Sequence, residues 1–315
     1  MPAGGINIYC MPPFDTMALV HDVGLGAFDA KYKIGFWQWE LSSFPVEAES
    51  VFELVDEVWT ISEFIAKSIR GATSKPVKVI PLPFENPISS GANRNHFGIP
   101  ENAYAYYFAF DGASFISRKN PLGTIDAFQR AFPEKGDSRV CLVIKTMGMK
   151  DDSLWRECLR RSMIDPRIII LNKVYSRDEL YSLMCSIDCF VSLHRAEGFG
   201  RLIAEAIVAE KQVIASKYSG SMDFLNEENA YLVDGVEIKL LPGDYHFYKR
   251  SEWFEPDIDC AAACFSKAFS DKREMNMEGL EVASRRFKSR YNLDVTGCSI
   301  KENLVSVFES ISDVN

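Results

Sequence analysis

The chain has 315 residues, of which 47% are hydrophobic and 25% charged, and its formal net charge is −9. This is the composition of a soluble globular protein long enough for two domains with separate cores. The acidic balance argues against a nucleic-acid partner, which requires a basic surface. No apolar run reaches the roughly 18 residues of a transmembrane segment, and we expect no signal peptide at the N-terminus.

Eight cysteines are present, and none forms a Cys-x-x-Cys motif. Two pairs are spaced four residues apart, Cys185/Cys189 and Cys260/Cys264. Two cysteines without a histidine make a poor zinc site, so we expect reduced, mostly buried thiols in a cytoplasmic protein.

Short apolar runs alternate with helical patterns, which is typical of β-α units with parallel sheets. In the first part of the chain the predicted strands are 6–11, 33–39, 57–61 and 77–81. The predicted helices are 46–54 and 62–70, the second with Ser62 as its N-cap. Four strands make a short parallel sheet whose edge needs covering. We therefore expect either missing strands or a second copy or partner chain along that edge.

Prolines and glycines crowd the region from 83 to 102, which indicates a linker. Beyond it the alternation restarts. The predicted strands are 104–110, 139–146, 167–171, 189–193, 212–216 and 230–233. The predicted helices are 120–132, 152–162, 177–185, 220–226 and one from about residue 200. The tail from about residue 258 has a helical pattern, and its last piece is amphipathic.

These patterns predict an α/β fold of two doubly wound, Rossmann-like domains with a ligand cleft between them. Residues 1–85 form the N-terminal domain, which we expect to be incomplete. A linker at 86–102 leads to a C-terminal domain at 103–290. We expect a final helix at 291–315 that packs back towards the N-terminal domain.

The sequence HRAEGFGRLIAEAI, residues 194–207, follows a predicted buried strand and places two glycines between Glu197 and Glu205. Ligands of open α/β sheets bind at the carboxyl ends of strands. The first N–H groups of the following helix lack partners and attract anions, and Gly198 and Gly200 allow a close backbone approach. The turn is therefore a candidate diphosphate site, although it matches neither the dinucleotide fingerprint nor the Walker loop.

The two glutamates should lie roughly 10 Å apart, too far to share a proton. Carboxylates spaced in this way can bind distant hydroxyl groups of one elongated ligand, and a sugar nucleotide has hydroxyl groups on both sides of a diphosphate. From the pattern alone, a turn residue and a solvent-facing helix residue explain the pair equally well.

The order of a strand, Glu197-Gly-Phe-Gly and then Glu205 after seven intervening residues resembles the E-x7-E motif of retaining GT-B glycosyltransferases of family four, the group-1 glycosyltransferases. SLHRAEGFG (192–200) and GFWQWELSSFP (35–45) are particularly similar to one bacterial branch of that family. The resemblance covers the chain from about residue 6 and implies a GT-B-like fold with a shortened N-terminal domain.

The resemblance implies that Glu205 binds the ribose hydroxyls of a nucleotide and that Glu197 contacts the donor sugar. It also implies that the diphosphate is held by the backbone of Phe199, Gly200, Arg201 and Leu202. The donor would be a GDP- or UDP-linked sugar, and neither a cofactor nor a metal would be required.

Arg118 and Lys119 follow the first strand of the second domain, where two cations suit a diphosphate because charge-assisted hydrogen bonds stabilise a leaving group. In the family a lysine near this position binds the phosphates, and Lys119 is the match. An exposed Arg-Lys pair is also common in solvated loops. Lys145, at the end of the next strand, is a third candidate.

Trp37, Trp39 and Glu40 lie at the carboxyl end of a first-domain strand. The family often has a catalytically important histidine in this region, and this sequence has none there. Glu40 can orient an acceptor or sugar hydroxyl. The tryptophans can stack on sugar faces or fill the core.

His194 is the best placed of four histidines, either to contact the sugar or to bond a loop carbonyl. Ser219 and Gly220 follow the strand at 212–216 and should line the same cleft. Asp257-Ile-Asp259 resembles a metal-binding Asp-x-Asp motif, but its position before an alanine-rich helix favours an N-cap, and no metal site is expected.

We therefore expect a metal-independent hexosyltransferase that acts with retention, with Glu197, Lys119, Arg118 and Glu40 as its catalytic residues. The resemblance implies a glycan or lipid-linked acceptor, polysaccharide assembly, and action in the cytoplasm or at the inner membrane face. Two alternatives stay open: a donor-binding subunit that depends on a partner for catalysis, and a nucleotide-sugar epimerase of the same fold.

Overall fold

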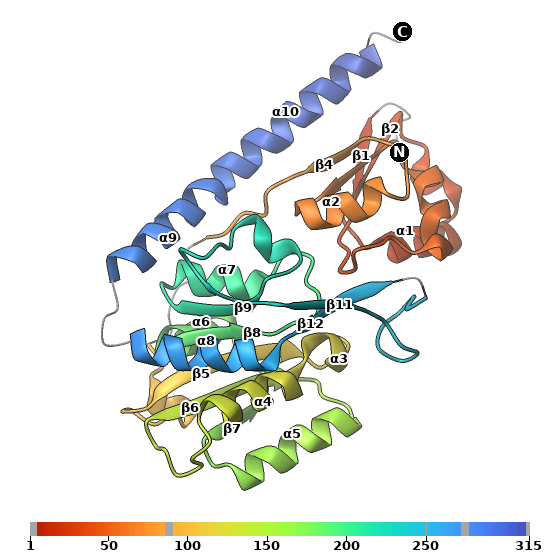
Figure 1. The fold of residues 1–315 in the computed structure, drawn as a ribbon. Coiled ribbons are helices and arrows are strands. Elements are labelled where there is room, and N and C mark those ends of the chain that lie inside the picture. Colours follow the sequence, from red (N-terminus) through yellow and green to blue (C-terminus); the bar gives the residue numbers. More distant parts are fainter. Residues whose placement is uncertain (1–4, 86–90, 250, 272–276, 313–315) are drawn as a thin grey trace.

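The computed structural model describes residues 5–85, 91–249, 251–271 and 277–312. The chain forms two parallel sheets, one in each part, and a separate antiparallel hairpin (Figure 1). The predicted α/β architecture is confirmed. The described residues do not include 86–90 of the predicted linker, 1–4 of the predicted N-terminal domain or 313–315 of the predicted final helix.

The N-terminal sheet has four parallel strands in the order β1-β2-β3-β4. They are β1 (Ile6–Tyr9), β2 (Tyr32–Phe36), β3 (Glu57–Thr60) and β4 (Val77–Val79). Each lies where it was predicted and ends earlier. The connections contain α1 (Pro13–Val23), η1 (Leu25–Phe28), η2 (Val46–Leu54) and α2 (Glu63–Arg70). Ser62 caps α2 as predicted, because its Oγ accepts a hydrogen bond from the N–H of Ile65 at 3.2 Å.

The C-terminal sheet has six parallel strands in the order β10-β9-β8-β5-β6-β7. They are β5 (Tyr104–Asp111), β6 (Val140–Met147), β7 (Ile168–Asn172), β8 (Cys189–Ser192), β9 (Gln212–Ser216) and β10 (Tyr231–Val233). The direction of strand addition reverses between β5 and β8, which is the doubly wound arrangement. Ligands of such sheets bind at this reversal.

Strand β5 shows why this sheet is buried on both faces. Seven of its eight residues are buried, and their side chains alternate between two apolar clusters. Tyr104, Tyr106, Phe108 and Phe110 face one cluster, and Ala105, Tyr107 and Ala109 face the other. An apolar run with strand alternation therefore forms the centre of the domain.

Helices cover both faces of the C-terminal sheet. One face packs on α4 (Pro121–Ala131), α5 (Ser153–Ile164) and α8 (Ile258–Asp271). The other packs on α6 (Arg177–Ser186) and α7 (Arg201–Val208). The cluster on this second face continues into the N-terminal domain, where it includes Trp37 and Ile65. The two domains therefore share apolar packing across their interface.

Three further short helices are α3 (Ile116–Lys119), η3 (Arg94–Phe97) and η4 (Gly220–Asp223). The sequence did not predict the hairpin of β11 (Gly235–Lys239) and β12 (Glu252–Pro256). This hairpin extends from the C-terminal domain to the underside of the N-terminal domain (Figure 1). At its end, the Oδ1 of Asp257 accepts a hydrogen bond from the N–H of Cys260 at 2.7 Å, so the predicted N-cap at this motif is confirmed.

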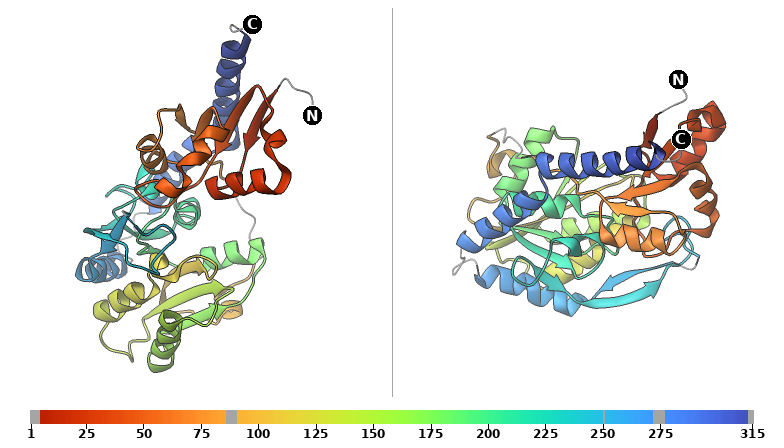
Figure 2. Two further views of the ribbon diagram at one scale, coloured as in Figure 1. Left: turned by 90° about the vertical axis from the view of Figure 1, so that its right-hand side faces the viewer. Right: turned by 90° about the horizontal axis from the view of Figure 1, so that it is seen from above.

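The chain ends in two further helices, α9 (Met277–Arg290) and α10 (Leu293–Ser312). Helix α10 crosses from the C-terminal domain to the N-terminal one (Figure 2). The Oγ1 of Thr296 donates a hydrogen bond to the carbonyl of Pro81 at 2.9 Å. Ile300 and Leu304 pack against a cluster on the first sheet that contains Trp59. The helix therefore covers one face of the N-terminal sheet. A partner chain along the edge of that sheet stays a prediction.

All eight cysteines are free. Only Cys141, Cys158 and Cys189 are buried, so the expectation of mostly buried thiols is wrong. Within the described ranges, no helix combines the length and apolar character needed to cross a membrane.

Replacing Ile300 with alanine should lower the free energy of unfolding by about 1–2 kcal/mol, because the half-buried side chain packs on the first sheet. Val305→Ala is the matched control on the same helix, since Val305 is 46% exposed and should change stability by less than about 0.5 kcal/mol. Urea unfolding measures both. Equal effects of the two variants would contradict the packing of α10.

Candidate active site

A cavity of about 290 Å³ lies at the carboxyl ends of β5, β6 and β8, where the strand order reverses. Apolar side chains such as Tyr107, Met184 and Phe190 form part of its wall. The predicted site residues that line it are Lys119, Lys145, His194, Glu197, Gly200, Arg201, Leu202 and Glu205. Arg118, Glu40, Gly198, Phe199, Ser219 and Gly220 do not line this cavity, but the contacts below connect each of them to it.

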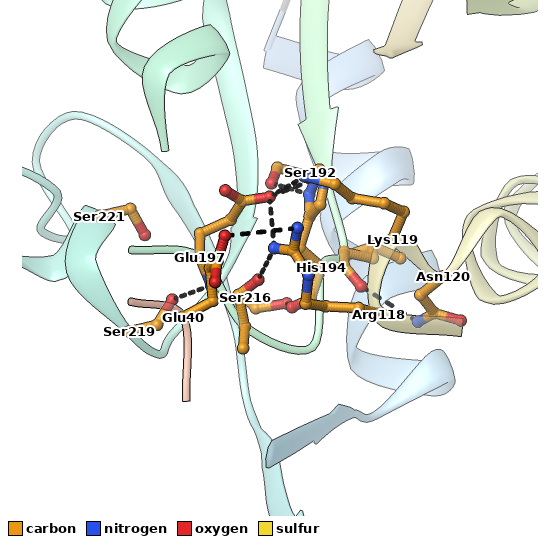
Figure 3. A network of polar contacts seen from close by, with 12 residues as sticks. Glu40, Arg118, Lys119, Asn120, Ser192, His194, Glu197, Ser216, Ser219 and Ser221 are labelled. Atoms are coloured by element: carbon orange, nitrogen blue, oxygen red, sulfur yellow. Dashed lines mark hydrogen bonds and ion pairs between the residues drawn. The ribbon is translucent and has the colours of Figure 1, made fainter. Parts of the chain in front are cut away.

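The carboxylate of Glu197 is the centre of a charged network (Figure 3). Its Oε1 accepts a short hydrogen bond from the ammonium of Lys119 and lies 3.5 Å from Nη1 of Arg118. Burial alone would raise the pKa of Glu197, but the two cations lower it to about 2. Glu197 is therefore ionised at neutral pH and accepts hydrogen bonds only.

His194 lies beside this carboxylate and is neutral. Burial, together with the nearby Lys119, lowers the pKa of His194 to about 3. Its Nε2 is 3.4 Å from Oε1 of Glu197, and its Nδ1 is 2.5 Å from Oγ of Ser192. In the tautomer that suits both neighbours, Nε2–H donates to the carboxylate and Nδ1 accepts from the Ser192 hydroxyl.

Local backbone geometry places the two cations at this site. Arg118 and Lys119 end the short helix α3, and Asn120 follows in a left-handed conformation with φ of 54°. The side chain of Asn120 caps α4 and also donates to the carbonyl of Leu193 at 3.1 Å. The turn that carries the cations is thereby fastened to the end of β8.

Arg118 is buried to 5% exposure and binds protein groups from three segments. Its Nη1 donates to the carbonyl of Ala196 at 2.8 Å, and its guanidinium lies over the ring of Tyr245 at 5.6 Å. Burial would lower the pKa of Arg118, but Glu197 and Glu40 raise it. Its buried Nε makes no hydrogen bond to any described residue, so a donor is left over at the site.

The glycine turn is built for close backbone packing. Gly200 is the N-cap of α7 with φ of +90°, a conformation that disfavours other residues. A Cβ on Gly198 would lie 2.7 Å from the carbonyl oxygen of Trp39 in the N-terminal domain. Phe199 points into the core, where it stacks on Phe84. The turn therefore offers its backbone to the cavity while its one large side chain anchors it.

Ser219 and Gly220 hold the backbone of Glu197 from behind. The Oγ of Ser219 accepts from the N–H of Glu197 at 3.1 Å, and the N–H of Gly220 donates to its carbonyl at 2.9 Å. A Cβ on Gly220 would lie 1.9 Å from the carbonyl oxygen of Gly198. Only glycine fits at this position.

Glu205 and Lys145 lie at the sides of the cavity. Burial raises the pKa of Glu205, whose Oε1 accepts a hydrogen bond from Nε of Arg201 at 3.2 Å. Lys145 is 6% exposed and makes no side-chain hydrogen bond or ion pair with a described residue. Burial lowers the pKa of Lys145, although the negative charge of Asp111 acts in the opposite direction. A second hollow of about 460 Å³ shares Leu180, Arg201 and Glu205 with the cavity. Together the two hollows can take an elongated ligand.

Glu40 reaches the network from the N-terminal domain. Its Oε1 is 4.0 Å from Nη2 of Arg118, and its Oε2 accepts a hydrogen bond from the hydroxyl of Tyr245 at 2.7 Å. Tyr245 is not among the site residues that the sequence predicts. It lies between β11 and β12, in a stretch without periodicity or a motif, so no signal in the sequence could have found it.

Comparisons with known proteins agree with this geometry. Residues 109–240 match the family model described as glycosyl transferases group 1. This segment is a group 1 glycosyltransferase sequence. The predicted resemblance to group 1 glycosyltransferases is confirmed. The segment contains Arg118, Lys119, His194 and Glu197 and every residue that lines the cavity except Tyr107, whereas Glu40 and Tyr245 lie outside it. No curated protein matches the chain.

The glycosyltransferase fold extends beyond the matched segment. Anabaena Alr3699/HepE in complex with UDP and glucose is similar at a TM-score of 0.70 and 20% identity, over 92% of this chain and 76% of that one. Pneumococcal O-GlcNAc transferase GtfA in complex with UDP and GlcNAc gives 0.61 and 15%, over 98% and 56%. Sucrose-phosphate synthase from Thermosynechococcus elongatus gives 0.68 and 13%, over 98% and 74%. At these identities the likeness shows the GT-B fold.

Burial decides between the two alternatives for the tryptophans, sugar stacking and core filling, in favour of the core. Trp37 and Trp39 are 0% and 4% exposed, and both belong to the apolar core. The indole N–H of Trp37 donates to Thr16, and that of Trp39 donates to the carbonyl of Ser43. Neither ring has a free face for a sugar.

Among the described residues, no group of three or more His, Cys, Asp or Glu side chains is arranged to hold a metal ion.

The buried neutral His194 should make stability depend on pH. The unfolded chain binds a proton at His194 near its ordinary pKa of 6.5, whereas the folded chain binds it only near 3. The free energy of unfolding should therefore fall by up to about 1.4 kcal/mol per pH unit as pH decreases through this window. His194→Gln should make that slope shallower in urea unfolding measured from pH 7 to 4. The exposed His21 provides the comparison variant, because a change in slope of the same size in His21→Gln would show that the effect is not specific to the buried site. An unchanged slope in His194→Gln would refute the neutral buried state.

Gly220→Ala should displace the turn that holds Glu197, because the new methyl group would meet backbone rather than a flexible side chain. We expect a loss of about 1–3 kcal/mol in stability. In Gly136→Ala nothing lies within 4 Å of the added Cβ, so it serves as the control. Thermal unfolding of both variants is the measurement. A Gly220→Ala protein as stable as the control would contradict the close approach.

Proposed function

We propose that this protein is a retaining, metal-independent glycosyltransferase that moves a hexose from a nucleotide-diphosphate sugar to an acceptor hydroxyl. The observation that carries the proposal is the ionised Glu197, held by Lys119 and Arg118 at the wall of a cavity that also contains the start of α7. A carboxylate binds sugar hydroxyls, while cations and free helix N–H groups bind a diphosphate. A sugar diphosphate needs these two kinds of group side by side.

In the proposed reaction, the bond between the anomeric carbon and the diphosphate oxygen breaks, and a bond to the acceptor oxygen forms on the same face. Lys119, Arg118 and the N–H groups at the start of α7 stabilise the charge on the departing diphosphate. The proton of the acceptor hydroxyl passes to that departing oxygen. No side chain of the protein needs to act as a base.

The remaining site residues have proposed roles in binding. Glu205 binds the ribose hydroxyls, and the apolar wall around Met184 and Phe190 suits the flat face of a base. Lys145 is a buried cation without a hydrogen-bonded partner in the described chain, so it can approach a phosphate oxygen. The backbone of Phe199, Gly200, Arg201 and Leu202 holds the diphosphate, and Glu40 orients an acceptor or sugar hydroxyl.

For the donor and the acceptor we propose classes of compound. The Anabaena and pneumococcal structures contain UDP, so UDP-hexoses are the first donors to test, with a GDP-sugar as the alternative. We propose a glycan or lipid-linked acceptor in polysaccharide assembly, reached from the cytoplasmic side of a membrane. Donor turnover that is unchanged by EDTA would support metal independence.

Lys119→Ala should lower kcat at least about 100-fold, because the leaving diphosphate loses its closest cation. Glu205→Gln should mainly raise KM for the donor, by about tenfold, because a neutral amide binds the ribose hydroxyls less strongly. The assay follows nucleotide release from whichever of UDP-glucose, UDP-GlcNAc and GDP-mannose stabilises the wild-type protein in a thermal shift experiment.

Lys135→Ala is the control, since Lys135 is exposed and lies outside the site. Near-normal donor turnover in both site variants would refute the assignment. Two outcomes with the wild-type protein would favour the alternatives. A C2 epimer formed without acceptor indicates an epimerase. Donor binding without turnover until a second protein is added indicates a partner-dependent subunit.

A further inference from the structure

The hairpin of β11 and β12 is fastened to the donor side of the cleft. Arg195, which lies next to His194 in the chain, pairs with Glu255 of β12 at 2.5 Å. Its carbonyl accepts the N–H of Phe254 at 2.9 Å, and its Nη1 donates to the carbonyl of Ser117 beside Arg118. The base of the hairpin is therefore fixed by the same segments that carry the charged network.

The connection between the two strands reaches the N-terminal domain. The ring of Phe247 stacks on Phe14 of α1 with centroids 4.5 Å apart and an interplanar angle of 3°. The Oγ of Ser117 donates to the carbonyl of Asp244 at 2.9 Å and fixes the other side of the connection. Tyr245 is thus held between two domains, with its ring edge-on to Phe115 and to Trp39.

From this position Tyr245 controls one oxygen of Glu40. Its hydroxyl donates to Oε2 at 2.7 Å, which is a normal distance for a hydrogen bond to a carboxylate. Oε1 then points towards Arg118, whose Nη2 lies 4.0 Å away. That distance is too long for a direct hydrogen bond and short enough for one hydroxyl group to bond with both groups.

The other charged neighbours make this orientation important. Arg118 and Lys119 both interact electrostatically with Glu40, and Glu197 and Glu40 both act on Tyr245. Without the hydroxyl of Tyr245, the Glu40 carboxylate would be free to turn and to pair directly with Arg118. The carboxylate of Glu40 and the guanidinium of Arg118 would then bind each other, and neither would be available to a substrate.

We propose that Tyr245 is a positioning residue for Glu40, which it holds so that the free Oε1 and the Arg118 guanidinium together receive one substrate hydroxyl. This inference rests on the proposed glycosyltransferase function and assigns to the hairpin a part in it. The donor is bound by the other residues, so loss of Tyr245 leaves donor affinity intact and acts on turnover.

Tyr245→Phe tests the hydroxyl alone, because the aromatic ring and its packing are kept. We expect kcat for nucleotide release to fall about tenfold, while KM for the donor and the donor-induced thermal shift change by less than twofold. The loss should be shared with Glu40: Tyr245→Phe in a Glu40→Gln background should cause little further loss, since both changes remove one coupled pair. The probe is the donor that stabilises the wild-type protein, with UDP-glucose first.

Tyr248→Phe is the matched control, because Tyr248 lies in the same connection and its hydroxyl has no hydrogen bond within the described chain. It should keep wild-type kcat. A wild-type kcat in Tyr245→Phe, or independent, multiplied losses in the double variant, would overturn the proposal. A raised donor KM in Tyr245→Phe would also overturn it, because it would place Tyr245 in donor binding.

A spectroscopic measurement separates this inference from the proposed function. Protein labelled with 3-fluorotyrosine gives a fluorine resonance for Tyr245 that is identified by its absence in Tyr245→Phe. Glu40→Gln should shift this resonance and leave that of Tyr248 in place. A Tyr245 resonance unmoved by Glu40→Gln refutes the positioning role even if the enzyme is active. A shifted resonance in a protein that turns over no nucleotide sugar supports the contact and refutes the proposed function instead.

Discussion

The buried carboxylate of Glu197 is the constraint that organises this site. An ionised carboxylate removed from water costs several kcal/mol unless cations and hydrogen bonds compensate for it. Lys119, Arg118 and His194 provide that compensation from two different loops. Both loops must therefore end at one point of the sheet edge. The left-handed Asn120 and the hydrogen bonds from Ser219 and Gly220 are the local means by which the backbone meets this requirement.

The same pairing leaves capacity for a substrate. An ammonium group has three donors and a guanidinium has five, so binding one carboxylate does not exhaust Lys119 or Arg118. The buried Nε of Arg118 makes no hydrogen bond with any described group, and Lys145 has no ion-pair partner among the described residues. A diphosphate placed between these cations would accept the hydrogen bonds that Glu197 leaves unused. The network is thus stable without a ligand and is still able to bind an anion.

Much of the fold follows from pattern alone, and the site follows from it only in part. The alternating apolar run of β5 predicts a strand buried on both faces, and strand ends at one edge predict that Lys119 and Glu197 converge. The hairpin was not predicted because β11 is short and its two alternating apolar residues, Val236 and Ile238, are exposed, while β12 places Trp253 and Phe254 next to each other without alternation. The contact of Tyr245 with Glu40 joins residues 205 positions apart and depends on how the domains pack. The sequence left open whether Trp39 stacks on a sugar or fills the core, because only the fold shows that its ring is enclosed.

Both domains build the turn that carries Glu197. The Oγ of Ser62, at the start of α2, donates to the carbonyl of Gly198 at 2.5 Å. The carbonyl of Trp39 lies so close to Gly198 that a side chain has no room there. On the other side of the network, Tyr245 and Glu40 join the hairpin to the loop after β2. Any change in the relative position of the domains must therefore disturb the glycine turn and Glu40 together. The acceptor side and the donor side of this cleft are coupled through backbone contacts at the turn and one hydroxyl group at its rim.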